Sequence, residues 1–151
     1  MTIEAASPTS SQADAGSIVG TWRLISCFME DVETEEQKAV WGHRPNGMLV
    51  ITAAGRWIVL QTAEGRKIPY TDENASTAFR SMLAYGGSYR TEKQKIVVHV
   101  DIAWDESWTG TEQVRFFSVD GDRLHIDAPP QRYANFGDRM MRAVLVWERV
   151  E

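Results

Sequence analysis

The sequence is poor in the residues that stabilise secreted domains or anchor membrane proteins. Cys27 is the only cysteine among 151 residues, so no disulfide can form within the chain. This favours a cytoplasmic location. No apolar run approaches the ~20 residues that a membrane-spanning helix needs. The first 16 residues also lack the basic and apolar regions of a secretory signal.

Positive charge and histidine are scarce as well. Lysine and arginine number 16 against 21 aspartates and glutamates, which gives a net charge of −5. Nucleic acids and anionic membranes attract basic patches, so we expect neither as a partner. The three histidines, His43, His99 and His125, lack the spacing of metal ligands. We also find no phosphate-binding loop, and we therefore expect no metal and no cofactor.

Tryptophan, by contrast, is abundant, with six copies in the chain. Such a content predicts a rigid aromatic interior or a pocket for a small molecule. The length is that of one domain with a core of its own. Residues 1–16 are small and polar, which predicts a flexible tail before a single domain over residues 17–151.

Short β-like runs separated by turn signals fill most of this domain. Gly55 and two other short turns predict hairpins between neighbouring runs. The eight runs are GTWRLISCFM, GMLVIT, RWIVLQT, SYRT, KIVVHVDIAW, GTEQVRFFSV, RLHIDA and MRAVLVWERV.

One helix is predicted near residues 72–84, where apolar residues repeat with helical spacing. Thr71 or Asp72 can cap its start, and Gly86 or Gly87 can end it. The apolar face is expected to pack on the wall or the mouth of the sheet structure, as a lid or as cover for an edge. The residues on this face are Ala75, Ala78, Phe79, Met82 and Leu83.

Eight antiparallel strands with short connections must protect their edges, and closure into a barrel does so completely. An eight-stranded interior holds packed side chains or one small ligand. A β-sandwich is the alternative, but its crossovers need longer connections. We therefore predict an all-β fold, an antiparallel barrel of eight or slightly more strands with one short helix.

The order and spacing of several segments resemble the bacterial and fungal lipocalin-like domain family, within the calycin barrels. The segments are IVGTWRLIS, NGMLVITAAGRW, AYGGSYRTE, IVVHVDIAWDESWTGTEQVRFFSVDGDRLHI, APP and LVWERV. The resemblance implies a barrel with a central cavity. It also implies that Trp22 seals the closed end, with Arg149 packed across it by a cation–π contact. Related barrels carry ligands or act as cyclases and isomerases.

The strand with His99 has two different faces. Ile96, Val98, Val100 and Ile102 form an apolar face, which by the simple rule points inward and leaves His99 in solvent. If Tyr89 pairs with Val97, however, the other face gathers polar and aromatic groups, as binding cavities do. The resemblance also carries a histidine and an arginine at these places, so we expect His99 and Arg115 to point inward.

The candidate ligand-binding residues follow from that choice of face. Arg115 would hold an anionic or carbonyl oxygen, and His99 would exchange a proton if the protein is an enzyme. Cys27 is interpreted as a buried inert thiol, and Glu112, Asp105 and Glu106 as turn or rim charges. Trp104 and Trp108 are interpreted as rim residues or as packing under a loop. The candidates are Tyr85, Tyr89, His99, Asp101, Gln113, Arg115, Phe117, Trp57 and Phe28.

The leading hypothesis is a protein that binds a small, mostly apolar organic molecule in a central cavity. The alternative is a cofactor-independent cyclase or isomerase of a secondary-metabolism intermediate, with His99 and Arg115 as catalytic residues. A third possibility is a protein–protein module, for which a homodimer through barrel strands is one assembly.

Overall fold

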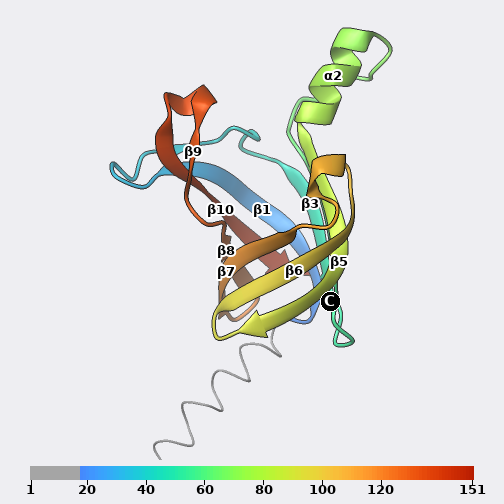
Figure 1. The fold of residues 1–151 in the computed structure, drawn as a ribbon, viewed down its shortest axis with the longest axis vertical. Helices are drawn as coiled ribbons and strands as arrows, with labels where there is room; N and C mark the ends of the chain where they lie inside the picture. Colours follow the sequence, from blue (N-terminus) through green and yellow to red (C-terminus); the bar gives the residue numbers. More distant parts are fainter. Residues whose placement is uncertain (1–17) are drawn as a thin grey trace, which may run out of the picture.

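The structure, a computed structural model, describes residues 18–151 as an antiparallel barrel (Figure 1). The predicted tail lies outside the described residues. The helices are α2 (Asp72–Arg80) and two short 3-10 turns, η1 (Glu106–Trp108) and η2 (Ala134–Phe136). The strands are β1 (Gly20–Asp31), β2 (Gln37–Lys38), β3 (Asn46–Ile51), β4 (Arg56–Thr62), β5 (Met82–Glu92), β6 (Lys95–Ala103), β7 (Glu112–Asp120), β8 (Arg123–Asp127), β9 (Gln131–Tyr133) and β10 (Arg139–Arg149).

Eight of these strands close the barrel, which confirms the predicted fold. They run in the order β1-β3-β4-β5-β6-β7-β8-β10, and β10 pairs back with β1. The two short strands β2 and β9 extend the sheet beyond the ring. Because the ring closes, the β-sandwich alternative is excluded and the eight barrel strands have no free edge.

The first strand changes face within its length. Trp22 and Leu24 point into the core, and a register shift against β10 lies between Leu24 and Ser26. After this bulge Cys27 and Met29 are the buried residues. A bulge inserts one extra residue on one strand, so the inward positions shift by one.

One end of the barrel is closed by Trp22, as the resemblance implies. Its indole is fully buried, and its Nε1 donates a hydrogen bond of 2.9 Å to the carbonyl oxygen of Ile18. The Arg149 guanidinium lies 4.3 Å from the centroid of the Trp22 ring and donates to the carbonyl of Val19. The main chain of Thr21 also exchanges hydrogen bonds with Val150 and Glu151, so both ends of the described chain meet here.

The helix is shorter than predicted and buries no residue. Thr71 caps it as expected, since its Oγ1 accepts a hydrogen bond of 3.1 Å from the N–H group of Asn74. The helix ends at Arg80, however, because Met82 and Leu83 already pair with β4. The expected packing of the apolar face on the barrel is limited to Phe79, whose ring lies 6.2 Å from that of Trp104 at the rim, and Figure 1 shows α2 standing beyond the mouth.

The β1–β10 pair is anchored near the mouth by Asp31. This side chain is only 5% exposed, and its Oδ2 lies 3.1 Å from Nη1 of Arg139. The N–H groups of Glu33 and Thr34 both donate to its Oδ1. The Thr34 hydrogen bond lowers the pKa of Asp31 most, burial opposes it, and Glu33 and Arg139 lower the pKa further. The ionised carboxylate therefore stabilises this end of the barrel.

Stability should accordingly fall in acid. Because the pKa of Asp31 is lower in the folded than in the unfolded chain, its contribution is present above the unfolded value of about 3.9 and is lost as the pH falls toward the folded one. Asp31→Asn keeps an oxygen for the two N–H groups but cannot titrate. We expect the variant to show a weaker fall in the urea midpoint between pH 6 and pH 3. An equal effect of Asp120→Asn, at the exposed end of β7, would contradict the assignment.

Residues 18–151 contain no helix with the length and apolar character needed to cross a membrane.

Candidate functional site: the barrel cavity

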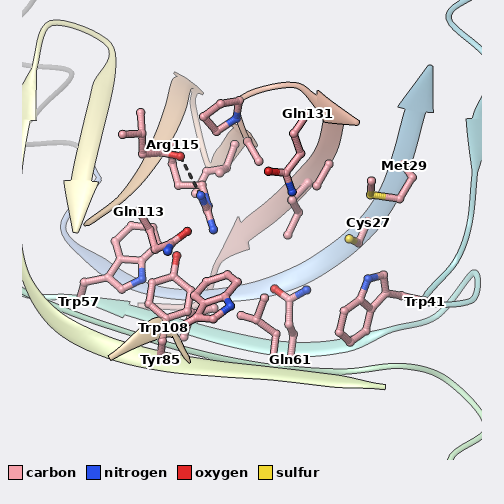
Figure 2. Close-up of a pocket in the computed structure, with 18 of the residues that line it drawn as sticks. Cys27, Met29, Trp41, Trp57, Gln61, Tyr85, Trp108, Gln113, Arg115 and Gln131 are labelled. Atoms are coloured by element: carbon pink, nitrogen blue, oxygen red, sulfur yellow. Dashed lines mark hydrogen bonds between the residues drawn. The ribbon is translucent and has the colours of Figure 1, made fainter. Parts of the chain in front are cut away.

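A cavity of about 400 Å³ opens inside the barrel (Figure 2). This volume lies in the range of small-molecule sites. Four of the six tryptophans contribute to its wall, which agrees with the aromatic interior predicted from the composition. These are Trp41, Trp57, Trp108 and Trp147.

The cationic side of the cavity is built around Arg115, on β7. Its neighbours across the sheet place it inward, because Arg115 pairs with the fully buried Ile96. Its Nη1 donates a hydrogen bond of 2.7 Å to the carbonyl of Val114, and its guanidinium carbon lies 5.8 Å from the centroid of the Tyr85 ring (Figure 2). No carboxylate among residues 18–151 forms an ion pair with it.

Tyr85 lies beside this guanidinium with its side chain buried. Burial raises the pKa of its hydroxyl, and the charge of Arg115 partly opposes that shift. The hydroxyl therefore stays protonated at neutral pH and can donate a hydrogen bond. Gln113, two residues before Arg115, adds an amide whose Nε2 donates a hydrogen bond of 2.9 Å to the Thr111 hydroxyl.

A chain of aromatic rings runs from this cluster to the helix. The Tyr85 ring lies 6.3 Å from Trp57 and 5.3 Å from Trp108, between ring centroids. Trp108 is 5.1 Å from Trp104, and Trp104 is 6.2 Å from Phe79 of α2. Trp108 therefore belongs to the cavity wall, whereas Trp104 packs between the rim and the helix.

The opposite side of the cavity, the sulfur and amide side, carries thiol, thioether and amide groups and no cation among the described residues. Cys27 and Met29 of β1 supply sulfur atoms, and Gln61 of β4 faces them with only 5% of its surface exposed. Gln131 reaches into the cavity from β9 (Figure 2). Burial raises the pKa of the Cys27 thiol to about 12, and its hydrogen bond to Gln61 lowers it slightly. This supports the interpretation of Cys27 as an inert thiol.

Cys27 should be almost unreactive in the folded protein. At pH 8 a thiol with a pKa of about 12 is ~0.01% thiolate, and only the thiolate attacks disulfides. We expect Ellman's reagent to react slowly with native protein and quickly in guanidinium chloride. Cys27 is the only cysteine, so the signal has one source. Equal rates in the two conditions would show that the thiol is open to solvent.

Four of the predicted site residues line this cavity. The expectation that Gln113, Arg115 and Phe117 share a face is confirmed, since each of the three pairs with a buried residue of a neighbouring strand. Phe117 lies in the packed core rather than against the cavity. The four that line it are Trp57, Tyr85, Gln113 and Arg115.

The expected inward position of His99 is wrong. Tyr89 pairs with Val98, not Val97, so Ser88 lies opposite His99 and the histidine points outward. The turn that sets this register has Lys93 at a left-handed φ of 59° and pairs Glu92 with Lys95. His99 and Asp101 are both half-exposed, with His99 Nε2 3.9 Å from Asp101 Oδ1, and Asp101 also pairs with Arg56.

The main chain of β6 packs directly against Gly87. A register shift between Gly86 and Gly87 brings the β6 backbone against Gly87, where an added Cβ would collide with the carbonyl of His99. The same shift turns Ile102 outward, where it is 68% exposed. The apolar face of β6 is thus inward only from Ile96 to Val100.

The other two candidates lie away from the cavity. Tyr89 is partly buried in the core, and its hydroxyl donates a hydrogen bond of 2.8 Å to the carbonyl of Thr52. Phe28 follows the bulge of β1, so it lies on the face opposite Cys27 and Met29 and outside the cavity lining. Both hold structural positions in the barrel wall.

Sequence reasoning missed the residues of the sulfur and amide side of the cavity. The alternation of Trp57, Val59 and Gln61 along β4 is a signal that could have identified Gln61. Trp41 and Gln131 come from loop and flanking segments without such periodicity. Glu112 does touch the cavity rim, but its carboxylate is half-exposed and paired with Arg90, as expected of a rim charge.

Within residues 18–151, no three or more histidine, cysteine, aspartate or glutamate side chains gather as metal ligands would. The polar groups that do converge in the cavity are amides, a phenol and a guanidinium. They suit hydrogen bonding to an organic molecule rather than coordination of a cation.

Comparison with known proteins agrees with the geometry. A family model described as a lipocalin-like domain matches residues 19–150, almost the whole described chain. The match confirms the resemblance seen in the sequence. None of the curated proteins matches the chain.

Proposed function

Because the chain belongs to the lipocalin-like domain family and its barrel encloses a cavity, we propose that it binds a small, mostly apolar organic molecule there through an anionic or carbonyl oxygen. Membership of the family supports small-molecule binding in general. The oxygen is inferred from the chemistry of the cavity wall.

The observation that carries this proposal is Arg115. A guanidinium has five donor N–H groups, and the hydrogen-bond partners of this one among residues 18–151 are the carbonyl of Val114 and the side chain of Tyr85. A cation in an aromatic cavity without a paired carboxylate is well placed to bind an anionic oxygen of a ligand. The Tyr85 hydroxyl beside it can donate a second hydrogen bond to the same oxygen.

Catalysis is supported less well than binding. The cyclase or isomerase hypothesis used His99 to move a proton, and His99 lies on the outer face of β6. Tyr85 is held in its protonated form by burial, which makes it a poor base at neutral pH. We therefore favour binding without turnover.

A cytoplasmic location belongs to the same proposal, supported by the single cysteine of the chain. The homodimer stays a prediction, which sedimentation equilibrium would test.

Binding can be tested by fluorescence, because tryptophans line the cavity. We expect 2-naphthoate to quench the tryptophan emission in a saturable way, with one site per chain. Naphthalene, which lacks the carboxylate, should bind more weakly. Equal affinity for the two compounds, or no saturation, would contradict the proposal.

A further inference from the structure

Gln61 is an unusual residue for the inside of a barrel. It occupies an inward position of β4, between the buried Val59 and the end of the strand, and 95% of its surface is covered. A buried amide that lacks partners is destabilising by about 1–3 kcal/mol, so such groups are normally hydrogen-bonded.

The protein itself supplies few hydrogen bonds to the Gln61 amide. A glutamine amide can form four hydrogen bonds. Among the described residues, the thiol of Cys27 is its one hydrogen-bond partner, and thiols are weak partners. The remaining capacity of the Gln61 amide is therefore directed into the cavity, where Figure 2 shows its side chain.

A second amide faces the same space. Gln131 of β9 projects from the other side of the cavity, at the mouth, with its amide directed inward (Figure 2). Arg115 lies on a different part of the wall, beside Tyr85 and Trp57. Gln61 and Gln131 thus face the same space from opposite sides of the cavity, away from the cluster of Arg115, Tyr85 and Gln113.

We propose that Gln61 and Gln131 form a second polar subsite, and that the ligand carries a hydroxyl or carbonyl group there in addition to the oxygen held by Arg115. This inference rests on the proposed function. It narrows the ligand class to organic molecules that carry a second polar substituent besides the anionic or carbonyl oxygen. An amide both donates and accepts, so it suits hydroxyl and carbonyl groups alike.

The subsite can be tested with hydroxylated forms of one probe. The affinities of 2-naphthoate and of its 5-, 6- and 7-hydroxy derivatives would be measured by isothermal titration calorimetry on the full chain. We expect at least one hydroxylated isomer to bind about three- to tenfold more tightly than 2-naphthoate, the gain of one hydrogen bond. Gln61→Leu should remove that gain, so that the hydroxylated isomer binds the variant no more tightly than 2-naphthoate does.

Two further variants keep the test decisive. Gln131→Leu lies at the exposed mouth, where folding is not at risk, and should reduce the same gain. Gln94→Leu, in the exposed β5–β6 turn, should change nothing. The subsite is refuted if no hydroxylated isomer binds more tightly, or if the gain persists in both cavity variants.

These outcomes are separate from failure of the proposed function. If 2-naphthoate binds and its affinity depends on Arg115, but hydroxylation has no effect, the binding function stands and the amide subsite is wrong. If 2-naphthoate does not bind in the cavity, both proposals fail together.

Discussion

Replacing Trp22 with alanine is expected to lower the free energy of unfolding by about 3–5 kcal/mol, the range for truncation of a large aromatic side chain in a core. Trp22 is fully buried, so its removal leaves a void at the closed end. It also removes the ring that lies 4.3 Å from the Arg149 guanidinium and the hydrogen bond to the carbonyl of Ile18. Guanidinium unfolding followed by far-UV circular dichroism would measure the loss.

A matched control is available in Trp104. This tryptophan is only half-buried and packs between the rim and α2, so Trp104→Ala removes the same side chain at a place where less surface is lost. We expect its unfolding midpoint to shift clearly less. If Trp22→Ala unfolded near the midpoint of the native protein, Trp22 would not be the residue that closes the barrel.

The second large effect is expected on binding. Arg115→Met keeps most of the aliphatic stem and removes the charge, so 2-naphthoate should bind roughly 10- to 150-fold more weakly. This corresponds to about 1.5–3 kcal/mol, the range for a hydrogen bond to a charged group. Naphthalene has no anionic oxygen, and its affinity should change little.

One arginine and one histidine on the outer surface of the barrel serve as controls. Arg56→Met removes a cation that pairs with Asp101 outside the cavity, and His99→Phe changes the half-exposed histidine beside it. Neither variant should alter the affinity for 2-naphthoate or its pH dependence. A loss of binding in His99→Phe equal to that in Arg115→Met would show that the cavity is not the binding site.

The fold could be predicted because strand alternation and turn residues are local signals. Counting every second residue places Gln113 and Arg115 of β7 on one face, and both lie in the cavity. The resemblance implies the positions of Trp22 and Arg149 at the closed end. These positions lie in strand segments where the pairing stays regular.

The errors lie where the pairing is irregular. His99 and Asp101 were misplaced because the two-residue turn at Lys93 shifts the register by one, which reverses every side chain of the strand. The β1 bulge moved Cys27 and Met29 inward and Phe28 outward in the same way. No residue type marks such bulges reliably, so the inward positions of Cys27 and Met29 were not predictable from the sequence.

The closed end of the barrel also determines how the protein can be handled. At this end the C-terminal residues are hydrogen-bonded to the first strand, because the main chain of Thr21 bonds to both Val150 and Glu151. The mouth, with β9 and α2, lies at the opposite end (Figure 1). A molecule tethered to a sensor chip through Glu151 would therefore present its cavity to the flowing solution, and a fluorescent partner fused at that position would not obstruct entry.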